Sequence, residues 1–137
     1  MSAWCHGAAG IGLARLTSAG QGDRDEVRRE IDTALGTTIR TGLGHNHSLC
    51  HGDGGRVELL LQAGHVLKHE GWNLEAHQIA HDIVDSISRN EYRCGTPLDV
   101  DAPGLMTGIA GIGYALLRLA EPGRVPSVLT LEPATGA

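Results

Sequence analysis

Two Cys-His dipeptides are the residues of this chain with the clearest capacity for chemistry. Cys5-His6 and Cys50-His51 each stand directly before a glycine, and an apolar stretch follows that glycine in both places. A thiol at the start of a helix has a lowered pKa and more readily becomes a thiolate, the form that binds metals. Thiolate sulfur and imidazole nitrogen are preferred ligands of zinc. The two dipeptides therefore indicate either a zinc site or, equally, two buried and inert cysteines at tight turns.

The dipeptides belong to a pattern that occurs three times. Gly-x-x-Gly followed by a helix-like apolar stretch begins at Gly7, Gly52 and Gly108, and the third copy has Met106-Thr107 in place of Cys-His. Repeats whose starts are separated by several tens of residues, as here, are typical of stacked supersecondary units, with insertions taken up in loops. Because the Gly-Lys-Ser/Thr of a phosphate-binding loop is missing, we interpret these glycines as tight turns between packed helices.

Two more helices are predicted between the repeats. One covers 23–35, with acidic residues in its first turn, where they suit the positive end of the helix dipole. The other covers 74–89, because its apolar residues fall on one helical face. These residues are Ala76, Ile79, Ala80, Ile83, Val84 and Ile87. Strand-like alternation is weak, so we predict an all-α fold of hairpins, each pairing a glycine-opened apolar helix with an amphipathic one.

Prolines exclude a continuous helix from Pro122 onward. We therefore divide the chain into a helical body, 1–121, and an extended tail, 122–137. The tail is expected to dock on the body through Val128, Leu129 and Leu131.

Composition excludes several functional classes. Among 137 residues, 16 Asp and Glu outnumber 11 Lys and Arg, and a net charge of −5 argues against a nucleic-acid partner. No apolar run approaches the ~20 residues of a membrane span. The N-terminus has neither the basic nor the apolar region of a secretory signal, so we expect a cytoplasmic protein. In that compartment three cysteines favour thiolate or metal chemistry over disulfides.

The residues around the dipeptides resemble those of one known family. Trp4-Cys5-His6-Gly7, taken with Ser48-Leu49-Cys50-His51-Gly52, resembles the zinc-binding signature of the lanthionine synthetase C-like (LanC-like) cyclases. The stretches 46–53 and 104–114 and the tail at 125–129 are most similar to the cyclase domain of the bifunctional class II enzymes (LanM). The resemblance covers nearly the whole chain, but only the C-terminal part of the family's cyclase domain.

The resemblance implies a fold and a reaction. The fold is an α/α toroid with inner helices opened by Gly-x-x-Gly, of which this chain holds part. Cys5, Cys50 and His51 would bind zinc and leave a fourth position open, as a catalytic zinc site requires. In the family that position takes the thiolate of a cysteine in a dehydrated precursor peptide. The thiolate adds to dehydroalanine or dehydrobutyrine, and a lanthionine or methyllanthionine thioether ring forms.

The enolate produced by this addition must be protonated, so the reaction needs a general acid. His6 follows the first ligand and is the candidate in this chain, although a simpler interpretation is that it orients the turn. The family's other catalytic residues, an Asp and a His, lie on earlier hairpins that would precede Met1. The dehydration domain of class II enzymes would also precede Met1. We therefore expect a fragment that associates with the remaining cyclase and dehydratase and has no cyclase activity alone.

Two alternatives remain. One is a zinc-dependent module that binds a thiol peptide or a glutathione-like ligand without catalysis. The other is a Cys/His hydrolase with Cys5 or Cys50 as the nucleophile.

The remaining histidines and cysteine have simpler interpretations. His45 and His47 could orient the ligands from nearby or lie in a solvated loop. Two i, i+4 pairs lack a third ligand and are expected to face solvent, namely His65 with His69 and His77 with His81. Cys94 is expected to be structural or incidental, and Trp4 to pack beside the metal-binding turn.

Overall fold

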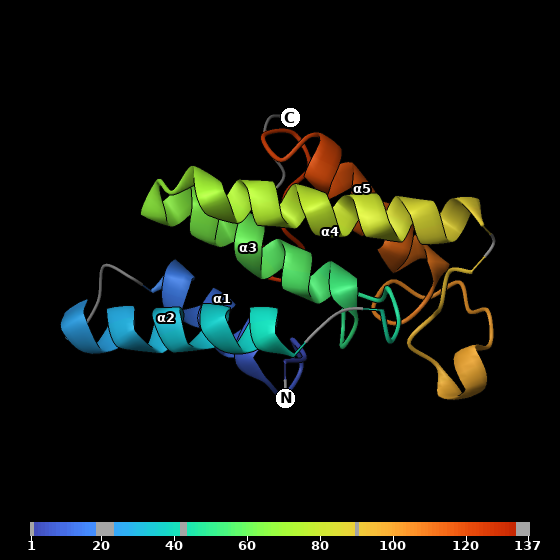
Figure 1. Cartoon of the computed structure of the whole chain (residues 1–137), viewed down its shortest axis with the longest axis horizontal. Helices are drawn as coiled ribbons and strands as arrows, with labels where there is room; N and C mark the ends of the chain where they lie inside the picture. The colour runs from blue at the N-terminus through green and yellow to red at the C-terminus, as the bar shows by residue number, and fades with distance from the viewer. Residues whose placement is uncertain (1, 19–23, 42–43, 90, 134–137) are drawn as a thin grey trace.

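The computed structural model of this chain describes residues 2–18, 24–41, 44–89 and 91–133. Within these ranges all regular structure is helical. The elements are α1 (Ala8–Thr17), α2 (Arg24–Arg40), α3 (Asp53–Leu67), α4 (Glu70–Ser88), the short 3₁₀ helix η1 (Pro97–Asp99) and α5 (Ile109–Ala120). The all-α prediction is confirmed, and the succession of inner and outer helices is that of part of an α/α toroid (Figure 1).

Helix α3 is the centre of the molecule. It pairs with α4 as a hairpin, as α1 does with α2, and it also contacts α1 and α5. Among the described residues α1 and α5 do not contact one another, so α3 separates them. Every residue from Asp53 to Gly64 is buried. A helix enclosed on all sides carries apolar residues all round rather than on one stripe, and its buried polar residues need partners inside the protein.

The two amphipathic helices are longer than the sequence pattern predicts. The helix expected over 23–35 continues to Arg40, and the one expected over 74–89 begins at Glu70 and ends at Ser88. The pattern places Val84 on the packed face of α4, but its side chain is 49% exposed. As an outer helix, α4 buries a narrower stripe, formed by Ala76, Ile79 and Ile83.

The tail folds back on the helices as far as it is described. Leu129 is buried in the core and Val128 packs against it, as expected. The expectation that Leu131 docks is wrong, because Leu131 is 84% exposed. The chain turns at this point, and the next residue, Glu132, is held to the body because it accepts hydrogen bonds from the Ser127 backbone N–H and the Gln62 side chain, although its own side chain is 38% exposed. No helix in the described ranges is both long and apolar enough to cross a membrane.

The second glycine of each repeat lies against a backbone carbonyl. A Cβ atom at these positions would overlap the carbonyl oxygen six residues earlier. The pairs are Gly10 with Trp4, Gly55 with Leu49, and Gly111 with Leu105. The first glycine of each repeat caps the helix with extended backbone. Glycine therefore lets each loop fold back onto the first turn of its own inner helix, and the tight-turn interpretation is confirmed.

Replacement of Gly111 by alanine should lower the free energy of unfolding by about 1–3 kcal/mol, because the new methyl group displaces the loop. Gly113 provides a matched control on the same helix, since a Cβ there would have no atom within 4 Å of it. Gly113→Ala should raise the stability by about 0.5–1 kcal/mol through helix propensity. Urea unfolding followed by circular dichroism measures both changes. Equal effects of the two substitutions would contradict the close approach.

Candidate metal centre

The three loops that precede the inner helices are joined by backbone hydrogen bonds. We call residues 2–7 the first loop, 44–52 the second loop and 102–108 the third loop. The Cys5 N–H donates to the Cys50 carbonyl at 3.3 Å, and the Cys50 N–H donates to the Met106 carbonyl at 2.8 Å. Trp4 also donates to the Cys50 carbonyl, at 2.9 Å. Equivalent positions of successive loops are thus bonded to one another, which places Cys5 beside Cys50.

This arrangement gathers the three residues to which the resemblance assigns zinc binding. The ligand atoms of Cys5, Cys50 and His51 all lie within 4.8 Å of one another. Two thiolates bound to one tetrahedral zinc are about 3.8 Å apart, given Zn–S bonds of ~2.3 Å, so little movement is needed. Across the described ranges no other group of three His, Cys, Asp or Glu meets this spacing. All three cysteines are free thiols.

The site has an open side. Cys5 is exposed, whereas Cys50 and His51 are half-buried. The third loop offers Met106 and Thr107 at the positions of Cys50 and His51. Neither a thioether nor a hydroxyl is a usual zinc ligand, so the loops bring together three candidate donors, and the solvent side would be free for a fourth.

The pKa of the Cys50 thiol is raised, which is opposite to the shift expected for a thiol at a helix start. Burial is the main cause that raises the pKa of the Cys50 thiol to about 11, and the hydrogen bond to Cys5 and the negative charge there act in the same direction. Two thiolates at this distance repel one another. A metal ion bound to both would stabilise their deprotonated forms.

His6 lies next to this group. Its Nδ1 atom is 2.9 Å from the Cys5 sulfur, and its side chain is exposed. His6 is not part of the three-donor group. It therefore lies on the accessible side of the site, and its role as a proton donor stays a prediction.

The other histidines separate into two kinds. His45 is exposed, but His47 is 5% exposed and hydrogen-bonded through both ring nitrogens, so the solvated-loop interpretation is wrong for His47. The two i, i+4 pairs are exposed as predicted, namely His65, His69, His77 and His81. Cys94 is fully buried in the core, and Trp4 is half-buried beside the loops.

Gly95 also lies at the site, although no pattern in the sequence predicts its place there. A Cβ atom at Gly95 would lie 2.5 Å from Ser48 Oγ and 2.9 Å from His51 Nε2, so this glycine leaves room for the His51 ring. The Gly95 N–H donates to the Thr107 carbonyl at 2.7 Å, which holds the segment against the third loop. Gly95 lies in a turn-rich stretch far from both dipeptides, and only the fold brings it to His51.

Comparison with known proteins gives a family match over most of the chain. The family model described as "Lanthionine synthetase C-like protein" matches residues 1–130. The chain belongs to the lanthionine synthetase C-like family. The resemblance seen in the motifs is therefore confirmed at the level of the family. The match includes the three loops and all three residues of the donor group.

A curated relative is named "Lacticin 481/lactococcin biosynthesis protein LcnDR2", from Lactococcus lactis subsp. lactis. It is 26% identical to this lanthionine synthetase C-like chain over an alignment of 129 positions, which covers 85% of the chain and 14% of the relative. The chain thus spans a small part of the length of the curated relative that it matches.

Replacement of Gly95 by alanine should weaken metal binding about tenfold, because the methyl group pushes the His51 ring out of place. The groups that it would meet are the ends of side chains, so the fold should be retained. Gly123→Ala is the control, since nothing lies within 4 Å of a Cβ there. Competition with a chromophoric chelator measures the zinc affinity. An unchanged affinity in Gly95→Ala would show that the ring position does not matter.

Proposed function

We propose that this chain carries the zinc site of a lanthipeptide cyclase, with Cys5, Cys50 and His51 as the three protein ligands. The observation that carries the proposal is the convergence of these donors to within 4.8 Å, from two loops separated in sequence by an entire helical hairpin. Membership in the lanthionine synthetase C-like family supports the same reaction. The detailed similarity to class II enzymes and the cytoplasmic location stay predictions from the sequence.

The substrate would be a dehydrated precursor peptide. Zinc, when bound, would supply the positive charge that keeps a peptide cysteine deprotonated at neutral pH. The peptide sulfur would form a C–S bond to the β-carbon of dehydroalanine or dehydrobutyrine, and the α-carbon would take up a proton. His6 is the candidate proton donor, because it is exposed and lies beside Cys5 on the open side. The product is a lanthionine or methyllanthionine ring.

The three ligands can be tested by metal content. Cys50→Ala and His51→Ala should each lose most of the bound zinc, since two donors hold the ion far less tightly than three. Cys94→Ala is the matched control, because Cys94 is a free thiol that lies outside the donor group. Elemental analysis of the purified proteins gives the zinc per chain. Unchanged zinc in Cys50→Ala would overturn the ligand assignment.

Thiol labelling separates the zinc site from the Cys/His hydrolase. With zinc present, Cys5 should react slowly with an alkylating reagent although its side chain is exposed. A hydrolase nucleophile would instead be labelled rapidly, because it must be a free and reactive thiolate.

Ring closure tests the catalytic part of the proposal. Since the chain spans 14% of its relative, we propose that it works together with the remaining parts of a cyclase and dehydratase. The purified chain alone should leave the cysteines of a dehydrated precursor peptide open, as counted by alkylation and mass spectrometry. Addition of the rest of a cyclase domain should close rings.

The two outcomes that contradict these expectations differ in meaning. Ring closure by the chain alone would show that these residues suffice. Full zinc content without ring closure in any combination would favour the module that binds a thiol peptide or a glutathione-like ligand without catalysis.

A further inference from the structure

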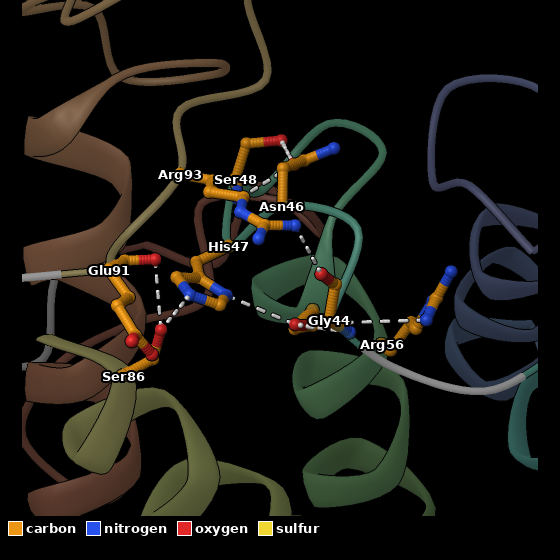
Figure 2. Close-up of polar contacts among 9 residues, drawn as sticks. Gly44, Asn46, His47, Ser48, Arg56, Ser86, Glu91 and Arg93 are labelled. Carbon is orange, nitrogen blue, oxygen red and sulfur yellow. Dashed lines mark hydrogen bonds and ion pairs between the residues drawn. The ribbon is translucent and has the colours of Figure 1, made fainter. Parts of the chain in front are cut away.

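Buried polar side chains hold the second loop in place, and the metal donors do not include them. His47 Nδ1 lies 3.1 Å from Asp53 Oδ2, and His47 Nε2 lies 3.1 Å from Ser86 Oγ (Figure 2). A carboxylate accepts hydrogen bonds, so Nδ1–H donates to Asp53. His47 therefore joins the loop to the first residue of α3 and to the last turn of α4.

Asp53 forms hydrogen bonds with the second loop at several points. Its side chain is buried and accepts the Gly44 N–H at 3.1 Å, as well as the His47 ring and the Arg56 guanidinium at 3.3 Å. Its backbone N–H donates to the Asn46 carbonyl at 2.9 Å. One carboxylate at a helix start, where negative charge is favoured, thus holds the beginning and the middle of the loop. We call His47, Asp53, Arg56 and Ser86 the loop clasp.

The third loop forms the same backbone bonds without such a clasp. The Ile109 N–H donates to the Ala102 carbonyl at 2.8 Å, as Asp53 does to Asn46. The Gly108 N–H donates to the Gly104 carbonyl at 3.0 Å, as Gly52 does to Ser48 at 3.2 Å. These are the equivalent bonds of two repeats. The backbone shape of the loop therefore forms without polar side chains behind it.

The residue types make this contrast sharper. Pro103 stands in the third loop where His47 stands in the second, and Ile109 stands where Asp53 does. The third loop carries Met106-Thr107, whereas the clasped loop carries Cys50-His51. The clasp is therefore present in the loop that carries the two donors and absent from the loop that has the same backbone shape without them.

Stability alone does not account for the clasp. Burial of a carboxylate, an imidazole and a guanidinium costs desolvation free energy, and well-packed apolar replacements of buried ion pairs are often neutral or stabilising. What a buried hydrogen-bonded network does provide is a preferred arrangement of the groups that it joins. For a loop with two metal donors, one fixed arrangement is what binding requires.

We propose that His47 and Asp53 are positioning residues that hold the Cys50-His51 step of the second loop against Cys5. They act through the loop, since neither belongs to the donor group. The part of this inference that concerns the metal rests on the function proposed above. The part that concerns the loop does not.

Amide exchange tests the loop without any metal. His47→Gln keeps a polar side chain but cannot reach Asp53 and Ser86 together. In the metal-free chain it should speed exchange of the Cys50 and Gly52 N–H groups at least tenfold, measured by NMR. The Gly108 and Ile109 N–H groups of the third loop should be unchanged. His45→Gln, the same substitution at an exposed histidine two residues earlier, should change none of these rates.

Metal affinity tests the consequence for the site. His47→Gln should weaken binding of Co²⁺ or Zn²⁺ about 10–100-fold, and the thiolate absorption of the Co²⁺ form should shift. His45→Gln should leave affinity and spectrum unchanged. Asp53→Asn removes the charge and keeps the shape. It should weaken metal binding and shift the spectrum in the same way as His47→Gln.

Each outcome decides the proposal. Unchanged loop exchange in a folded His47→Gln overturns it, and so does equal acceleration in the second and third loops. If His47→Gln does not fold, Ser86→Ala removes one bond of the clasp and is measured in the same way. If the unaltered chain binds no metal, the proposed function fails, while the exchange rates still decide the role of the clasp.

Discussion

The rest of the structure depends on the contact between a glycine and a backbone carbonyl, repeated at Gly10, Gly55 and Gly111. Each contact turns a loop back over the first turn of the inner helix that follows it. The loops consequently gather at one end of α1, α3 and α5, where their backbones bond to one another in sequence order. Only then do Cys5 and Cys50 become neighbours. The grouping of the candidate metal donors is thus a consequence of how closely two stretches of backbone approach.

The polar residues of α3 show how a fully enclosed helix is connected to its surroundings. Because α3 is buried on all sides, its charged groups must find partners inside the protein. Asp53 bonds to the second loop, Glu58 pairs with buried Arg118 of α5 at 3.3 Å, and Gln62 bonds to Glu132 of the tail. Successive turns of one helix thereby fix a loop, a neighbouring helix and the tail. These bonds add specificity to a core that is built from small aliphatic residues.

Much of this could be predicted from local sequence, because the signals are local. The Gly-x-x-Gly copies predict the inner helices, and the i, i+3, i+4 pattern predicts α4 apart from its first turn. The donor group was predictable because family residues carry it in two short motifs. By contrast, the partner of His47 is Ser86, 39 positions along the chain, and Gly95 meets His51 only after the loops assemble. Leu131 was misassigned because apolar character alone does not tell which side of a turn faces inward.

The placement of the three donors has a mechanical consequence. Cys5 precedes α1, whereas Cys50 and His51 precede α3, so an ion held by all three would tie the first hairpin to the second. Such a tie closes a loop that contains all of α1 and α2, and it stabilises the native state by mass action. The contacts of α3 with α4 and α5 carry no such tie. A bound metal would therefore stabilise one interface of the molecule, between α1 and α3. It would act as a structural cross-link in addition to its chemical role.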